Sequence, residues 1–327
     1  MLPHFLCIGT QKAGTTWLYH NLDRHPQVWM PPVKEVFYFC GFALGPNGMP
    51  GAPSKLPLAL QVLQPRNAAL RQLAREAVRK GWRRVRGGVA PSPPEARSAA
   101  AVPSPPAEAA PSQHQAPGAS GFARATWMLR YALLPRTDGW YASLFQPGPG
   151  QISGDITPYY ANLGEDRVAR IHGMLPHAKI LYLLRDPVER LWSEAGMQSR
   201  RGGIALTDRD PRALEVWFRG HAQKQLNDYV GNLRTWQRFY RDAQVLVGFF
   251  DELNEDPVGL LRRVCGFLEI DDSPERMPAD VGAKRNAGQD HGIPARWVEF
   301  LRGLFADQLR DLHARFENRY TARWLRQ

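Results

Sequence analysis

The chain has 327 residues, enough for one sizeable domain or two small ones, and its composition, 43% hydrophobic and 22% charged, is that of a globular protein. Its 42 lysines and arginines against 31 acidic residues give a net charge of +11, which favours anionic partners in general: nucleic acid, anionic lipid, and sulfated or phosphorylated small molecules.

The three cysteines (Cys7, Cys40 and Cys265) are an odd number and lack metal-like spacing, which argues against disulfides and a zinc site. Cys7 and Cys265 lie in apolar runs, so we expect buried, inert thiols. No apolar run approaches the ~20 residues that a helix needs to span a bilayer.

The chain begins with an apolar strand, a small-residue turn and a helix. We expect the strand over residues 4–8, and a helix from Thr15 that ends before Pro26, because proline disfavours helical geometry in the residue ahead of it. A strand so near the start leaves no room for a signal peptide, so we expect a cytoplasmic protein.

The turn GTQKAGTT has the features of an anion site, because the N–H groups and the positive dipole end of a helix N-terminus point at such a turn. It is not the usual nucleotide loop. In G-x-x-x-x-G-K-[ST] the lysine follows the second glycine, whereas Lys12 precedes Gly14 by two residues. A plain turn is the alternative interpretation.

A segment at about 45–125 interrupts the pattern, and we interpret it as an insertion in a single domain that spans residues 1–327. Residues 66–86 predict an amphipathic helix rich in arginine, which either contacts an anionic acceptor or a membrane surface, or is the solvated outer face of an ordinary helix. Residues 87–121 are rich in proline, alanine and serine and predict disorder, because they hold too little apolar surface to offset chain entropy.

Two further strand-to-helix units follow. Residues 180–184 form a continuous apolar run typical of a buried parallel strand, and Asp186 with Pro187 and Glu189 predicts a capped helix start, a capping-box arrangement. Residues 244–250 predict another strand, and Asp256 opens the next helix. Residues 214–240 and 295–316 also have helical patterns. This alternation predicts an α/β fold of three layers, with a central parallel sheet flanked by helices.

Arg185 stands at the carboxyl end of the strand 180–184, and Ser193 lies two turns into the helix that follows. Ligands of an open parallel sheet bind at the carboxyl ends of its strands, so the Lys12 turn and Arg185 should face the same edge. A surface ion pair would explain Arg185 alone. Together, the two sites favour a nucleotide with two separate phosphate groups.

Several of these stretches resemble sulfotransferases that use 3′-phosphoadenosine 5′-phosphosulfate. The stretch GTQKAGTTWLY resembles their 5′-phosphosulfate loop, and LLRDPVERLWS is similar to their 3′-phosphate strand and helix. PPVKEVFYF, GWYASLF, GDITPYY and VGFFDELNEDPVGLLRRVCGFLEI look like further family segments, in family order. The resemblance covers roughly residues 4–42 and 127–290. It implies a P-loop-like fold, and the residues that it assigns to the co-substrate are Gln11, Lys12, Ala13, Gly14, Thr15, Thr16, Trp17, Arg185 and Ser193.

The resemblance also implies a mechanism without a metal, in which Lys12 stabilises charge on the leaving oxygen. Glu35 matches the general base of the glycosaminoglycan-type members, and Asp155 in GDITPYY is the second candidate. An ordinary exposed pair of Lys34 and Glu35 is the alternative. The cytosolic members that sulfate phenols and steroids have a Lys-x-His segment, which this sequence lacks.

The sequence departs from the family in two places. Ile156 stands where the glycosaminoglycan relatives commonly have lysine, and GAKRNAGQDHGIP is only loosely similar to the second 3′-phosphate loop, where Arg285 is our candidate and a plain surface loop is the alternative. The acceptor group is a hydroxyl or, less favoured, an amine. A carbohydrate-bearing acceptor is favoured over a small aromatic or lipid alcohol, and Phe37, Tyr38, Tyr159 and Tyr160 either stack on a sugar or belong to the core.

Two other functions fit parts of the sequence. A P-loop kinase would need a lysine after Gly14 and a strand-end carboxylate for Mg²⁺, where Thr15 and Arg185 stand. An inactive anion-binding module is the other alternative, and the presence of both Lys12 and Glu35 argues against it, because binding alone would not need them. A nucleic-acid binder is disfavoured because no module with base-stacking aromatic residues is visible. The sequence does not indicate an oligomeric state.

Overall fold

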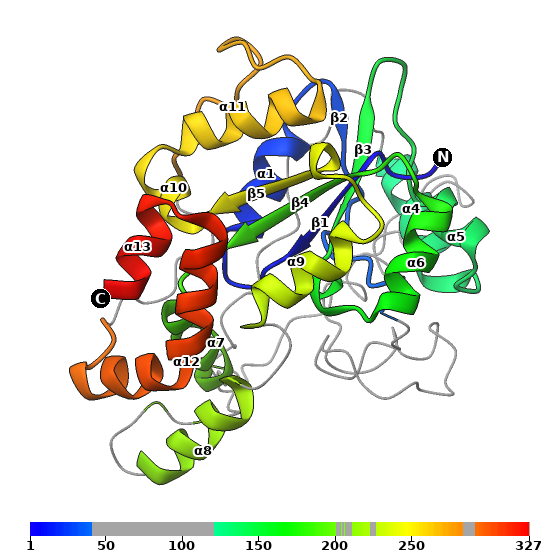
Figure 1. Cartoon of the computed structure of the whole chain (residues 1–327). Helices are drawn as coiled ribbons and strands as arrows, with labels where there is room; N and C mark the ends of the chain where they lie inside the picture. Colours follow the sequence, from blue (N-terminus) through cyan, green and yellow to red (C-terminus); the bar gives the residue numbers. More distant parts are fainter. Residues whose placement is uncertain are drawn as a thin grey trace, which may run out of the picture. The chain divides into compact units, whose positions relative to one another are not determined.

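The computed structural model describes residues 1–40, 121–200, 204, 206, 211–222, 227–283 and 292–326 (Figure 1). The chain divides into two compact units, one formed by residues 1–41 and 141–327 and the other by residues 42–140. The basic helix expected over residues 66–86, the tract 87–120 and Arg285 lie outside the described residues. Gly121, which we placed at the end of the disordered tract, is the first residue of helix α4 (Gly121–Leu133).

A parallel sheet forms the centre of the first unit. Its five strands run in the order β2-β3-β1-β4-β5, and every pairing is parallel. Their bounds are β1 (Phe5–Gly9), β2 (Val28–Trp29), β3 (Ile152–Ile156), β4 (Lys179–Leu184) and β5 (Val245–Phe249). The three strands expected from apolar runs are β1, β4 and β5, so the predicted α/β fold with a central parallel sheet is confirmed.

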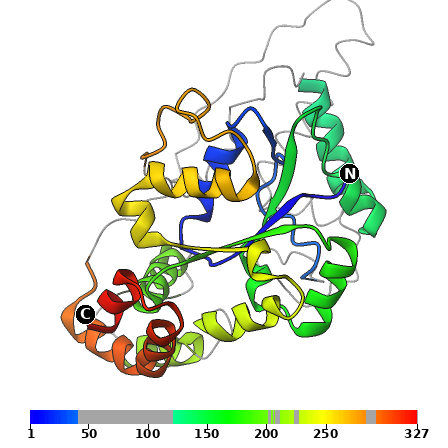
Figure 2. The same cartoon turned by 45° about the horizontal axis from the view of Figure 1, so that its top comes forward.

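Helices cover both faces of the sheet (Figure 2). On one face, α1 (Thr15–Asp23) and α11 (Pro257–Leu268) pack against Phe5 and Cys7 of β1 and Leu181 and Leu183 of β4. The other face carries the 3₁₀ helix η1 (Pro158–Asn162), α6 (Glu165–Met174) and α9 (Tyr229–Gln237). Both sides of β1 and β4 are therefore buried, which explains their unbroken apolar sequences.

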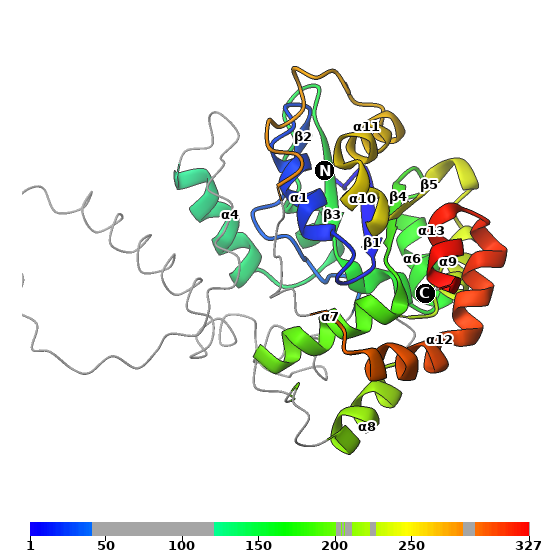
Figure 3. The same ribbon diagram turned by 90° about the vertical axis from the view of Figure 1, so that its left-hand side faces the viewer.

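A group of helices continues beyond the sheet (Figure 3). Helix α12 (Ala295–Phe316) packs against α7 (Pro187–Arg200), α8 (Pro211–Ala222), α9 and α13 (Arg319–Arg326). The short α10 (Phe250–Glu255) follows β5 directly. The amphipathic pattern expected over residues 295–316 is confirmed, whereas the segment 214–240 forms two helices, α8 and α9. In the described part of the chain, no helix has the length and apolar character to cross a membrane.

The described part of the second unit consists of α4 and the first residues of α5 (Asp138–Ser143). Trp127 stacks on Tyr131 with ring centroids 5.2 Å apart, and the indole N–H of Trp140 donates to the carbonyl of Arg130 at 3.1 Å. These contacts join the helix to the turn that follows it.

The three cysteines are free and buried. Burial raises the pKa of the Cys7 and Cys265 thiols to about 12, so both stay protonated at neutral pH. The expectation of buried, inert thiols at these two positions is confirmed.

Candidate active site

The chain turns tightly between β1 and α1. The N–H of Thr10 donates to the carbonyl of Leu183 at 2.5 Å, and the N–H of Leu18 donates the first helical hydrogen bond to the carbonyl of Gly14 at 3.0 Å. Gly14 has a φ of +88°, and a Cβ built on it would lie 2.6 Å from the Leu253 side chain. The positive φ favours glycine at this position, and a larger residue would also displace the Leu253 side chain of α10.

The start of α1 suits an anion. Its first turn contains no acidic residue, and its N-cap, Gly14, has no side chain to cap the helix. The N–H groups that precede the first helical bond, those of Thr15, Thr16 and Trp17, point out of the helix end. The Trp17 side chain is buried in the core and donates to the carbonyl of Val281 at 2.6 Å, so only the backbone of Trp17 can reach a ligand.

The structure brings Arg185 to this turn. Its Nη1 donates to the carbonyl oxygen of Lys12 at 3.1 Å, and its guanidinium lies over the Phe250 ring at 4.3 Å. Nε and Nη2 donate to the carboxylate of Glu189 at 3.2 and 3.1 Å. The hydroxyl of Tyr229 donates to the Arg185 carbonyl at 3.0 Å. Arg185 therefore forms an ion pair, as the alternative interpretation of this residue expected. It also contacts the turn GTQKAGTT, residues 9–16, which we call the anion loop.

The topology explains why these two segments meet. Strands β3 and β2 lie on one side of β1, and β4 and β5 lie on the other, so the connections after β1 and β4 diverge between neighbouring strands. Such a point in a parallel sheet leaves a crevice at the carboxyl ends of the strands, where ligands bind. The expectation that the Lys12 turn and Arg185 face the same edge is confirmed.

Asp186 fixes the start of α7 directly after Arg185. Its Oδ1 accepts from the N–H of Val188 at 2.8 Å, as expected of a cap, and its Oδ2 accepts from Arg302 of α12 at 3.0 Å. Burial raises the pKa of Asp186 to about 6. Glu189, expected to complete a capping box, binds Arg185. Ser193 lies two turns into α7 and is half-buried.

Lys34 joins the anion loop to Glu35. Its Nζ donates to the hydroxyl oxygen of Thr15 at 3.1 Å and to Oε1 of Glu35 at 3.0 Å. The segment is held on both sides of this pair, because Tyr19 donates to the carbonyl of Pro31 at 2.7 Å and the N–H of Val36 donates to the Thr157 hydroxyl at 3.1 Å. The Glu35 side chain is 28% exposed, so it is accessible to a bound molecule. The Lys34–Glu35 pair is thus tied to the loop rather than being an isolated surface pair.

Asp155, the second candidate base, is fully buried at the end of β3. Its carboxylate accepts hydrogen bonds from Tyr141 at 3.0 Å, Tyr160 at 2.9 Å and Thr157 at 2.7 Å. Burial raises the pKa of Asp155 to about 6, although the three hydroxyl donors oppose this rise. Thr157 in turn accepts from the N–H of Val36, so Asp155 fixes the segment that carries Glu35.

The four aromatic residues near the site differ in exposure. Phe37, Tyr38 and Tyr160 are buried and belong to the core, which excludes them as free stacking faces. Tyr159 is half-buried, and its ring lies 5.4 Å from that of Phe37. Of these four, Tyr159 is the one that is partly exposed.

The sequence did not predict the contacts that three residues make in the site: Lys34, Glu189 and Phe250. Lys34 stands beside Glu35 in the sequence, which was a usable signal, but its contact with Thr15 spans 19 residues. Glu189 stands four residues after Arg185, the spacing of a helical ion pair. Nothing in the sequence links Phe250 to Arg185.

Residues 55–274 match the Sulfotransferase family. Among curated proteins, heparan sulfate glucosamine 3-O-sulfotransferase 3B1 of Mus musculus is 33% identical over 137 residues, which are 40% of this chain and 35% of that protein. Membrane-associated sulfotransferase kil1 of Dictyostelium discoideum is 50% identical over 38 residues, 12% of this chain and 8% of that protein. The alignment with the first of these relatives thus spans about a third of that protein's length.

A solved structure has the same fold. The crystal structure of a sulfotransferase from Alicyclobacillus acidocaldarius aligns over 100% of both chains with a TM-score of 0.60 and 20% sequence identity. The three-layer α/β fold is therefore P-loop-like, as expected.

The family match differs in extent from the resemblance found in the sequence. It includes most of the segment 45–125, which we placed outside that resemblance, and it starts after the Lys12 loop. Geometry rather than this match therefore supports the roles of residues 9–17. Since the match spans more than half of its residues, the chain belongs to the Sulfotransferase family.

Proposed function

We propose that the protein transfers a sulfuryl group from 3′-phosphoadenosine 5′-phosphosulfate to a hydroxyl group of a carbohydrate-bearing acceptor. The observation that carries this proposal is the position of Lys34, which contacts both Thr15 of the anion loop and the carboxylate of Glu35. A candidate anion-binding loop and a partly exposed carboxylate thus contact the same ammonium group. Transfer to a hydroxyl needs this combination, because one group must hold the donor and another must accept the proton of the acceptor.

The residues present fit a co-substrate with two separate phosphate groups. The acid-free N-terminus of α1, with the Thr15 and Thr16 hydroxyls and Lys12, suits the 5′ end of the co-substrate. Arg185 and Ser193, at the adjacent strand end and in α7, suit its 3′-phosphate. Glu189 holds Arg185 in place, but a doubly charged phosphate offers the guanidinium a stronger partner than one partly exposed carboxylate does.

Each residue has a separate task in this proposal. When bound, the co-substrate supplies the sulfuryl group, and negative charge grows on the oxygen that bridges sulfur and phosphorus. Lys12 is the cation that stabilises this charge. Glu35 accepts the proton of the acceptor hydroxyl, and Lys34 orients its carboxylate. Asp155 is a positioning residue, since it lies buried behind Thr157 and Val36.

The choice of acceptor rests on chemistry around Glu35 and on the names of the relatives. The matched curated relatives include heparan sulfate glucosamine 3-O-sulfotransferases, which supports a sugar hydroxyl over an amine. Tyr159 offers a partly exposed ring to a sugar. Ile156 is fully buried where the glycosaminoglycan relatives commonly carry lysine, so an acceptor held by a cation at that position is not expected.

The proposal is tested by product analysis. Purified protein is incubated without metal with co-substrate labelled in the sulfuryl group and with three acceptor classes: N-acetylglucosamine oligosaccharides, simple phenols, and long-chain alcohols. We expect label on a carbohydrate hydroxyl, as located by mass spectrometry. Label on phenols alone would overturn the acceptor class. Transfer of phosphate from labelled ATP, with no sulfuryl transfer to any acceptor, would overturn the reaction itself.

A further inference from the structure

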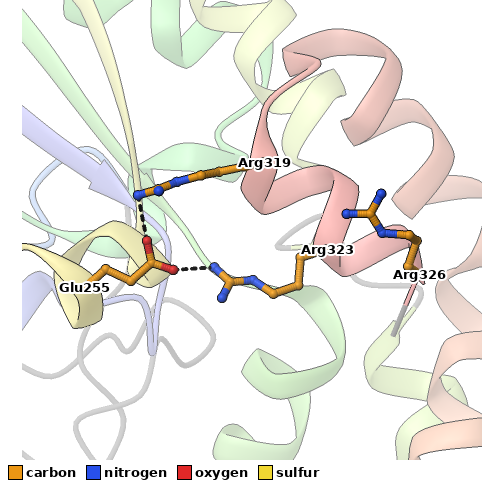
Figure 4. A pocket seen from close by; sticks show the side chains of 4 residues that line it. All are labelled: Glu255, Arg319, Arg323 and Arg326. Atoms are coloured by element: carbon orange, nitrogen blue, oxygen red, sulfur yellow. Dashed lines mark hydrogen bonds and ion pairs between the residues drawn. The ribbon is translucent and has the colours of Figure 1, made fainter.

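A cavity of about 370 Å³ lies beside the last helix of the chain (Figure 4). Three arginines of α13, Arg319, Arg323 and Arg326, and Glu255 at the end of α10 line it. The arginines follow the spacing i, i+4, i+7, which places them on one face of α13. The residues between them pack inward, since the Tyr320 and Trp324 rings contact Phe249 at 5.5 and 5.7 Å. The arginine face is thus fixed by the core contacts of the opposite face.

The cavity lining has an excess of positive charge. Glu255 is the single carboxylate among the described lining residues, and it pairs with Arg319 at 2.6 Å and with Arg323 at 2.8 Å. The hydrogen bond from Arg323 and the charge of Arg319 hold the pKa of Glu255 below its usual value, so it is ionised at neutral pH. Arg323 also reaches Asp251 of α10 at 3.1 Å. No ion pair among the described residues involves Arg326.

This cavity is separate from the candidate active site. Phe250, whose ring lies under Arg185, begins α10, and Glu255 ends it five residues later. That spacing corresponds to about 7.5 Å along the helix axis. The cavity is therefore beside the far end of the helix that supports Arg185, and none of its lining residues belongs to the Lys12 loop or to α7.

We propose that this cavity binds a sulfate or phosphate group of an anionic ligand. The planar guanidinium fork matches two oxygens of such a group, and three arginines line this cavity. Glu255 already shows the binding mode, because its two oxygens each meet a different arginine. An incoming oxyanion binds Arg326 and competes with Glu255 for Arg319 and Arg323. The group comes either from a free ion or from a sulfated carbohydrate.

Removing an arginine and removing the Glu255 carboxylate should have opposite effects on oxyanion binding. Arg319→Gln and Arg326→Gln should each weaken oxyanion binding by about two- to fivefold, the range for exposed ion pairs. Glu255→Gln should tighten binding, because it removes the competing carboxylate. Arg310→Gln is the matched control: it removes an exposed arginine of α12 that pairs with Asp307 and lies outside the cavity lining, so the net charge changes equally.

Nuclear magnetic resonance of the full chain is the test, with the Trp324 indole N–H as local reporter. This group donates to Asp251 at 2.9 Å beside Arg323, and Trp324→Phe assigns its signal. Asp251 follows Phe250, whose ring lies under Arg185, so each titration is repeated in Arg185→Ala to exclude shifts that come from the candidate active site. The protein is titrated at constant ionic strength with sodium sulfate, sodium phosphate, glucose 6-sulfate and, as neutral control, glucose. We expect saturable shifts with the three anions and none with glucose.

Two outcomes bear on the source of the group, and both support the site. Tighter binding of glucose 6-sulfate than of sulfate identifies a sulfated carbohydrate, and the reverse order identifies a free ion. The proposal is overturned if the Trp324 signal shows no saturable shift, or if Arg310→Gln weakens binding as much as Arg326→Gln does. Neither result depends on sulfuryl transfer, so this site can fail or stand independently of the proposed function.

Discussion

Lys34 connects the two halves of the candidate chemistry at the level of single residues. Its ammonium group contacts the Thr15 hydroxyl on one side and the Glu35 carboxylate on the other, and 19% of its side chain is exposed. A lysine in this place can keep the base close to the anion loop without being consumed in the reaction. The proposed function therefore gives the two lysines different roles, Lys12 for developing charge and Lys34 for orientation.

Lys12→Ala should lower kcat by about 10²–10³-fold, because preorganised charge at a developing anion commonly contributes that much. The melting temperature should stay close to that of the wild type, since Lys12 is partly exposed in a turn and keeps its backbone contact with Arg185 through its carbonyl. Steady-state kinetics and thermal unfolding measure the two quantities. Lys12→Arg, which keeps the positive charge at this position, is the matched control. A Lys12→Ala enzyme with near wild-type kcat would exclude Lys12 from the mechanism.

Glu35→Gln should lower kcat by about 10²–10⁴-fold with little change in co-substrate binding, as expected for loss of a general base. Lys34→Gln should have a smaller effect, because the carboxylate remains but loses its orienting partner. Both variants are compared by kcat and by the affinity for 3′-phosphoadenosine 5′-phosphate. Unchanged turnover in Glu35→Gln would assign the base to another residue, with Asp155 as the next candidate.

Asp155 gives a prediction about stability. Its folded-state pKa of about 6 lies above the value of about 4 in an unfolded chain, so between these pH values the folded state holds a proton that the unfolded state has lost. Stability from this group is therefore present at low pH and lost as the pH rises to 6, by up to about 3 kcal/mol. Chemical denaturation of the wild type and of Asp155→Asn at several pH values isolates the effect, because the raised pKa of Asp186 is common to both proteins. Parallel curves for the two proteins would contradict the buried, raised-pKa state.

At the level of elements, three helices brace Arg185 from behind. Phe250 of α10 lies under its guanidinium, and the next residue, Asp251, accepts from the Trp324 indole of α13 at 2.9 Å. Arg302 of α12 donates to the carbonyl of Trp324 and to Asp186, the residue after Arg185. These contacts link α10, α12 and α13 to Arg185 and Asp186 at the end of β4.

Arg302→Met should destabilise the fold by about 3 kcal/mol, because it leaves the buried Asp186 carboxylate without its cation. Equilibrium unfolding in urea measures this change. The double variant Asp186→Asn/Arg302→Met should recover part of the loss, since no buried charge then remains unpaired. A double variant as unstable as Arg302→Met would show that the ion pair is not the cause. In folded Arg302→Met, co-substrate KM should rise more than kcat falls, because Arg185 loses part of its support.

A strand or helix could be predicted from the sequence when its own residues carry the signal for it. Strands β1, β4 and β5 were predictable because each has an unbroken apolar run, and the caps Asp186 and Asp256 marked the helices that follow β4 and α10. Strand β3 was missed because its sequence, ISGDI, is not continuously apolar. It is buried because Gly154 lies directly under the Phe5 ring, where a Cβ would come within 2.0 Å. That packing depends on a residue 149 positions away.

The candidate site also divides into contacts that general rules predict and contacts that depend on distant residues. Lys12 and Arg185 could be placed at one edge because strand ends in a parallel sheet meet there. The contact of Lys34 with Thr15, and the choice between Glu35 and Asp155, could not be predicted, because each depends on how a loop without regular structure folds back. The burial of Asp155 rests on Tyr141 and Tyr160, whose hydroxyl groups nothing in the sequence directs toward it.

At the scale of the whole molecule, the sheet gathers residues from distant parts of the chain into one site. Lys12, Lys34 and Arg185 come from three segments, and the order β2-β3-β1-β4-β5 places the turn after β1 beside the residue after β4. Membership of the Sulfotransferase family and a fold shared with a solved sulfotransferase agree with this arrangement. The central claim is that this edge of the sheet binds a nucleotide with separate 5′ and 3′ phosphate groups.

Calorimetric titration with 3′-phosphoadenosine 5′-phosphate, without added metal, tests this claim most directly. We expect saturable binding that is lost in Arg185→Ala and kept or tightened in Glu189→Gln, because the second variant removes only the competing carboxylate. ATP under the same conditions should bind much more weakly, since it lacks a 3′-phosphate. Binding of ATP with Mg²⁺ but not of 3′-phosphoadenosine 5′-phosphate, or equal binding by wild type and Arg185→Ala, would show that this edge does not bind such a nucleotide.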